Sequence, residues 1–175
     1  MIGKAISDFD KAISLNSKII SYYYNRGNAY LNLKLFEDAI KDYNRVIELE
    51  PMNAIAYCSR GNAHTQADKL KEAIKDFSLA IKINPNFVSA YIGRANAHYK
   101  MKKNKRAILD YDYAERLDPN HRTVHLNRGI AYRAEGNSFD AAKDFNTFLK
   151  NNLDKKTLSA KVRAWIIDMG ETPDL

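Results

Sequence analysis

The chain has 175 residues, 45% of them hydrophobic and 28% charged, which suits one folded domain and excludes a disordered polymer. Its net charge of +7 permits an acidic partner or a nucleic acid but specifies no activity. No apolar run approaches the roughly 18 residues of a membrane-spanning helix, the start does not read as a signal peptide, and the single Cys58 excludes an internal disulfide. We therefore expect a cytoplasmic protein with no membrane partner.

The first predicted element is a helix over residues 1–14, within a segment that extends to residue 19. Because this segment matches only the second half of the repeating unit described below, we expect the natural chain to continue before Met1. The helix has no preceding helix to cover its apolar stripe, so we expect an exposed face that promotes self-association. The stripe consists of Ile2, Ile6, Phe9 and Ile13.

A period of 34 residues organises the chain from residue 20 onward. Pro51, Pro85 and Pro119 are 34 residues apart, and each follows an apolar helical stretch that a proline cannot continue. Each period contains two stretches with apolar spacings of three and four, which predicts a pair of antiparallel helices. The predicted pairs are 20–33 with 36–50, 54–67 with 70–83, 88–101 with 104–117, and 122–135 with 138–151.

The predicted organisation is a half unit, four whole units and a terminal cap. The cap is a helix whose apolar stripe, including Trp165, covers the last unit and presents a polar outer face. We interpret Trp165 as a packing residue. The segments are 1–19, 20–53, 54–87, 88–121, 122–153 and 154–175.

Small and large residues recur in fixed register within the units. Small residues on both helices of a pair allow the two backbones to approach closely, and an aromatic residue on the second helix fills the space beside them. The first-helix positions are Gly27, Gly61, Ala95 and Gly129; the second-helix positions are Ala39, Ala73, Ala107 and Ala141; the aromatic positions are Tyr43, Phe77, Tyr111 and Phe145.

This pattern resembles the tetratricopeptide repeat family over nearly the whole chain. The first whole repeat carries the signature at Gly27, Tyr30, Ala39, Tyr43 and Pro51, and the next two repeats match it in turn. The resemblance implies an all-α fold, a right-handed superhelical solenoid of antiparallel helix pairs. It also implies that the first helices line a concave groove and that the chain is a noncatalytic protein-interaction scaffold.

Arginine and aspartate recur together 16 residues apart. An arginine beside the small residue of each first helix needs a carboxylate if it is partly buried, and an aspartate lies beside each aromatic residue. We interpret these residues as a structural ion-pair ladder, with Asp8 as a further acid for Arg26. The pairs are Arg26 with Asp42, Arg60 with Asp76, Arg94 with Asp110, and Arg128 with Asp144.

Asparagine recurs at the centre of the first three whole first helices, although it is a poor helix former. Since the resemblance places this register in the groove, the amides are candidates for binding the backbone of an extended peptide. The alternative is that they are inherited from a duplicated ancestor and satisfied by water or neighbouring helices. The predicted groove residues are Tyr24, Asn25, Asn28, Cys58, Ser59, Asn62, Ile92, Asn96, Tyr99, Leu126, Asn127 and Arg133.

The sequence contains no phosphate-binding glycine loop, nucleophile elbow or paired-carboxylate constellation, so we predict neither catalytic residues nor a cofactor. His121 and His125 have a spacing that can chelate a metal, but no third ligand is evident and we predict no metal site. His64 and His98 occupy packing positions.

Two other classes of partner are a nucleic acid and the acidic tail of a chaperone. The basic run from Lys100 to Arg106 permits nucleic-acid binding, but it lacks interleaved stacking aromatics, so nucleic acid is the disfavoured reading. A family variant binds acidic chaperone tails through Lys, Asn and Arg residues, and this chain has Tyr24, Ser59, Ser89 and Gly93 where that clamp needs Lys, Asn, Lys and Arg. We therefore expect a protein or extended peptide as the partner.

Overall fold

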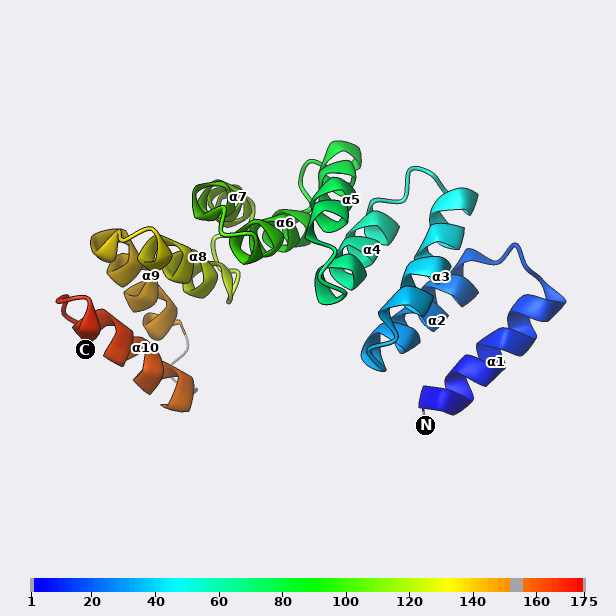
Figure 1. Ribbon diagram of the computed structural model, residues 1–175, viewed down its shortest axis with the longest axis horizontal. Helices are drawn as coiled ribbons and strands as arrows, with labels where there is room; N and C mark the ends of the chain where they lie inside the picture. The colour runs from blue at the N-terminus through cyan, green and yellow to red at the C-terminus, as the bar shows by residue number, and fades with distance from the viewer. Residues whose placement is uncertain (1, 152–155, 175) are drawn as a thin grey trace. The chain divides into compact units, whose positions relative to one another are not determined.

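The computed structural model describes residues 2–151 and 156–174, and this described part consists of ten α-helices with no strand (Figure 1). The predicted helix bounds differ most at the eighth helix, which begins at Val124 instead of residue 122. The expected boundary between residues 153 and 154 lies outside the described residues. The helices are α1 (Ile2–Leu15), α2 (Ile20–Asn32), α3 (Phe36–Leu49), α4 (Ala54–Gln66), α5 (Leu70–Ile83), α6 (Val88–Lys100), α7 (Asn104–Leu117), α8 (Val124–Ala134), α9 (Ser138–Lys150) and α10 (Lys156–Asp168).

The chain divides into two compact units, Met1–Ala97 and His98–Leu175. In the first unit, α1 packs on α2, α2 on α3, α3 on α4 and α4 on α5. In the second unit, α7 packs on α8, α8 on α9 and α9 on α10. Within each unit these helices therefore pack on their neighbours in sequence, which is the contact pattern of a stacked helical repeat.

Glycine permits the close approach of paired helices. A Cβ atom added at Gly61 on α4 would lie 2.9 Å from the ring of Phe77 on α5, which is fully buried. An added Cβ atom at Gly129 on α8 would lie 2.7 Å from the ring of Phe145 on α9. The small and aromatic residues of the repeat therefore meet in the core, as the sequence predicts.

One residue in each repeat adopts a left-handed backbone between its two helices. Three of these residues are not glycine: Lys34, Asp68 and Lys102 have φ angles of 60°, 58° and 57°. The amide of Leu35 then donates to the Tyr30 carbonyl at 2.9 Å, and the bond recurs in later repeats, which satisfies a carbonyl at the end of the first helix. Gly136 takes this place in the fourth repeat, with φ of 78°.

The first and last helices differ in burial. α1 has no buried residue, and Ile2 is 41% exposed, so the predicted self-association through its apolar stripe stays a prediction. In α10, Val162 and Ile166 are fully buried in a cluster with α9, and the Trp165 ring lies 5.6 Å from that of Phe145. None of the described helices is long and apolar enough to cross a membrane.

Candidate functional site

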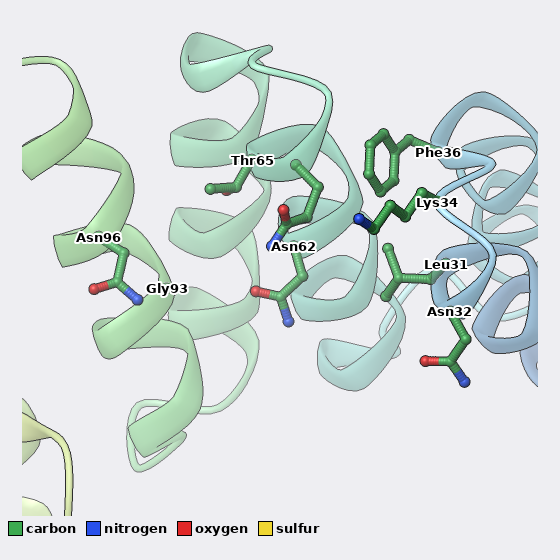
Figure 2. Close-up of a pocket in the computed structure, with 9 residues that line it drawn as sticks. Leu31, Asn32, Lys34, Phe36, Asn62, Thr65, Gly93 and Asn96 are labelled. Carbon is green, nitrogen blue, oxygen red and sulfur yellow. The ribbon is translucent and has the colours of Figure 1, made fainter. Parts of the chain in front are cut away.

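The first unit contains a hollow of about 660 Å³ bordered by its first helices (Figure 2). Helices α2, α4 and α6 supply most of the lining, and the turn residue Lys34 adds a positive charge. Leu31 and Phe36 make part of the wall apolar. The lining residues are Leu31, Asn32, Lys34, Phe36, Asn62, Thr65, Gln66, Gly93 and Asn96.

Two of the three predicted asparagines, Asn62 and Asn96, line this hollow. Asn62 is exposed near the middle of α4, and Asn96 lies at the corresponding position of α6. Figure 2 shows their amide groups on adjacent helices, bordering the same space. An amide can donate and accept at once, so this wall can satisfy both polar groups of a peptide backbone.

Asn28 is placed differently from the other two asparagines. The hydroxyl of Tyr43 donates to its Oδ1 atom at 2.7 Å, and Asn28 does not line the hollow. In the next repeat the aromatic position is Phe77, which has no hydroxyl to donate to Asn62. Asn28 and Asn62, which share one register, therefore have unequal access to a ligand.

Two predicted groove residues, Cys58 and Ile92, are buried, and this corrects the prediction. Cys58 is only 4% exposed, because it lies near the start of α4 and packs with Phe77 and Ala90. Burial raises the pKa of its thiol to about 12, so it is not a reactive thiolate. Ile92 is 8% exposed. The accessible stripe of each first helix is narrower than the sequence register indicates.

The remaining predicted residues of the first unit lie outside the hollow. Tyr24 and Ser59 place their hydroxyl oxygens 3.3 Å apart, which links α2 to α4. Tyr24 also borders a separate apolar hollow beside Ile20 and Ile55. Asn25 is exposed on α2.

Four predicted groove residues belong to the second unit. Tyr99 is 36% exposed, and Asn127 is half-buried on α8. Leu126 packs against the core cluster of α9 and α10. The guanidinium of Arg133 lies 5.3 Å from the centre of the Trp165 ring, so the capping helix already occupies one side of it.

Arg26, Arg60 and Arg128 of the ladder form bidentate ion pairs with their aspartates. Arg60 donates from Nε and Nη2 to the two carboxylate oxygens of Asp76, at 2.8 and 2.6 Å. Arg26 binds Asp42, and Arg128 binds Asp144, with the same geometry. The pairing of Arg94 with Asp110 stays a prediction. These planar contacts suit a structural role within the helix pairs.

Each ladder arginine has a second partner that sequence reasoning missed. This partner precedes the arginine by 16 residues: Arg26 donates from Nη1 to Asp10 at 2.6 Å, and Arg60 donates to Asn44 at 2.7 Å. The expected partner Asp8 is therefore wrong, because Asp10 occupies the register that meets the next first helix. The signal was present as a periodic polar position, formed by Asp10, Asn44, Ser78 and Asp112.

A dense charge cluster surrounds Arg128 in the second unit. Besides Asp144, Arg128 binds Asp112 and Glu115, and His125 places Nδ1 3.2 Å from Asp144. The hydrogen bond to Asp144 raises the pKa of His125 despite its burial. Burial favours protonation of Asp144, but Arg128 and His125 outweigh it and lower the pKa of this carboxyl.

His121 does not join His125 in a chelating pair. Its Nδ1 atom lies 3.3 Å from the Thr123 hydroxyl. Among the described residues, no group of three His, Cys, Asp or Glu side chains is arranged to hold a metal ion.

Comparison with known protein families identifies the family to which these helix pairs belong. Profiles described as tetratricopeptide repeat match residues 20–53, 54–87 and 92–152. The chain belongs to the tetratricopeptide repeat family. No curated protein matches it.

Several solved structures share the tetratricopeptide fold. A crystal structure of MamA is 25% identical over 91% of this chain and 91% of that chain, with a TM-score of 0.77. YrrB, described as a protein with an unusual peptide-binding site, is 20% identical over 91% and 83%, with a TM-score of 0.74. The first such domain of Spaghetti (RPAP3), bound to the HSP90 peptide SRMEEVD, is 24% identical over 66% and 92%, with a TM-score of 0.64. This tetratricopeptide chain is therefore an all-α helical-repeat solenoid.

Proposed function

We propose that this tetratricopeptide chain is a noncatalytic, cytoplasmic interaction module that binds an extended peptide of a partner protein. The observation that carries the proposal is the hollow bordered by Asn62 and Asn96 on adjacent first helices. An extended peptide presents alternating backbone donors and acceptors, which side-chain amides can pair with regardless of peptide sequence.

The rest of the lining provides selectivity. Lys34 favours an acidic residue in the peptide, and Leu31 with Phe36 favours an apolar one. The relatives YrrB and RPAP3 support the proposal because their structures are described with a peptide-binding site and a bound peptide. The chaperone-tail class is disfavoured here, since Tyr24 and Ser59 occupy clamp positions and contact each other.

Peptides selected from a random display library on the full chain test this proposal. We expect calorimetry to give an affinity that depends only weakly on salt, because the amide contacts are uncharged and Lys34 supplies a single charge. A fluorescent single-stranded RNA provides the contrasting probe for the basic Lys100–Arg106 turn. Tight RNA binding that falls steeply with salt, without any selected peptide, would favour the nucleic-acid alternative.

A further inference from the structure

The segment after α10 contacts side chains of α9. Gly170, with φ of 77°, ends the turn after α10, and the amide of Glu171 donates to the Ile166 carbonyl at 3.1 Å. A left-handed residue is readily adopted by glycine, and here it directs the chain back toward α9. Residues 171–174 then contact the side chains of Asn146 and Lys150.

Asn146 holds this segment by its backbone. Its Nδ2 atom donates to the Thr172 carbonyl at 3.4 Å, and its Oδ1 atom accepts from the Asp174 amide at 3.0 Å. In an extended backbone, a carbonyl and the amide two residues later point to the same side. A single side-chain amide therefore recognises an extended peptide at this surface, independently of the peptide's side chains.

Lys150 adds a preference for an acidic residue. Its Nζ atom lies 2.9 Å from the Asp174 carboxylate. Pro173 favours an extended conformation at Thr172, the residue before it. The Lys150 and Asp174 side chains are 66% and 48% exposed. Exposed ion pairs are weak, so a competing peptide can replace this segment.

The segment leaves part of the surface uncovered. A hollow of about 390 Å³ remains beside it, lined in part by Phe139, Ala142 and Lys143. Phe139 is 71% exposed, and Lys143 is exposed on the same face of α9. A peptide with an additional apolar residue would contact more of this surface than the chain's own segment does.

We propose that α9 carries a second docking surface, formed by Phe139, Lys143, Asn146 and Lys150, for an extended acidic segment of a partner protein. Residues 171–174 occupy it as an internal, displaceable ligand. This surface is separate from the Asn62 hollow, and the inference is independent of the proposed groove function. Because the segment is part of the same chain, its effective concentration at this surface is high. A partner peptide must therefore bind more tightly, or be more concentrated, to displace it.

Nuclear magnetic resonance on the ¹⁵N-labelled full chain tests this inference. The probe is a synthetic peptide, acetyl-Glu-Thr-Pro-Asp-amide. The readouts are the backbone amide signals of α9 (Ser138–Lys150), which every variant retains, and the side-chain amide signal of Asn146 where it is present. The variant Asp174→Lys removes the Lys150 ion pair and releases the segment. If the segment occupies the surface about nine-tenths of the time in the wild type, the released variant should bind the probe roughly tenfold more tightly.

Two further variants complete the test. Adding Asn146→Ala to the released variant should abolish probe binding, while adding Asn151→Ala, an exposed residue outside the hollow, should leave it unchanged. Circular dichroism verifies that each variant is folded. The inference is overturned if millimolar probe does not move the Asn146 signal in the released variant, if wild type and released variant bind equally, or if the Asn146→Ala variant still binds.

Discussion

The Tyr43 hydroxyl donates a 2.7 Å hydrogen bond to the Asn28 side chain, and the next repeat has Phe77 in place of Tyr43. This single oxygen atom separates two asparagines that occupy the same register. Asn28 serves the helix pair α2 and α3, whereas Asn62 borders the hollow.

Removing the Tyr43 hydroxyl should weaken the first repeat slightly. Tyr43 is fully buried, and Tyr43→Phe deletes one hydrogen bond without altering the packed ring. We expect a loss of about 1 kcal/mol in the free energy of unfolding. Urea denaturation followed by circular dichroism measures the loss, and equal stability of variant and wild type would contradict the assigned bond.

Removing one partner of a ladder ion pair should lower the free energy of unfolding more than removing both partners. Asp76 is only 3% exposed, so Asp76→Ala leaves the Arg60 guanidinium without its main carboxylate and should cost about 3 kcal/mol. Combining it with Arg60→Met should recover part of that loss. As a control, the exposed Lys69–Glu37 pair should show coupling below about 1 kcal/mol. Additive losses for Asp76 and Arg60 in the double-mutant cycle would refute a structural pair.

His64 and His125 should respond to pH in opposite directions. Asp144 raises the pKa of His125 above 6.5, so its contribution to stability is full below pH 6.5 and is lost as pH rises through the folded-state pKa. Burial lowers the pKa of His64 below 6.5, so the first unit loses stability as pH falls through 6.5, where the unfolded chain takes up a proton.

Proton titration of the two imidazole rings checks this pair of pKa directions, with amide hydrogen exchange reporting the stability of each unit. His125 faces Asp144, Glu115 and Arg128, and the net negative charge of these groups favours its protonated form. His125→Gln should remove the decline of the second unit at higher pH. A His125 pKa below that of His64 would be incompatible with the described contacts.

Replacing the turn residue Lys102 by glycine should stabilise the folded protein. Its φ angle of 57° is unfavourable for a residue with a Cβ atom, and Gly136 occupies the same register in the next repeat. We expect Lys102→Gly to stabilise the protein by about 0.5 to 1 kcal/mol after the added flexibility of the unfolded chain is included. Urea denaturation tests the sign, and Gly136→Ala should shift stability the opposite way.

Much of the fold follows from the 34-residue period. Pro51 and its equivalents locate the ends of the second helices, and Gly61 with Phe77 shows why paired helices approach closely. The left-handed backbone of the turns could not be predicted, because Lys34 and Asp68 are not glycines and nothing in the sequence indicates a positive φ at these positions.

The candidate site was only partly predictable. Register identified Asn62 and Asn96, but it treated Asn28 as equivalent because it ignored the residue that packs against each amide. Register also chose Asp8 over Asp10, since Asp8 shares the repeat position of Asp42, whereas the partner in the preceding helix lies two residues later in the repeat. The contact of Asn146 with residues 171–174 belongs to no period and required the structure.

The most direct measurement of the groove proposal is calorimetry of one display-selected peptide with the wild type, Asn62→Ala and Asn28→Ala. The two substitutions are matched in chemistry and register, and differ in whether the amide borders the hollow or binds Tyr43. We expect Asn62→Ala to weaken binding roughly fivefold, the equivalent of about 1 kcal/mol for one hydrogen-bonding amide, and Asn28→Ala to leave binding within about twofold while lowering stability. Unchanged affinity in a folded Asn62→Ala variant, or an equal loss in both variants, would contradict the account.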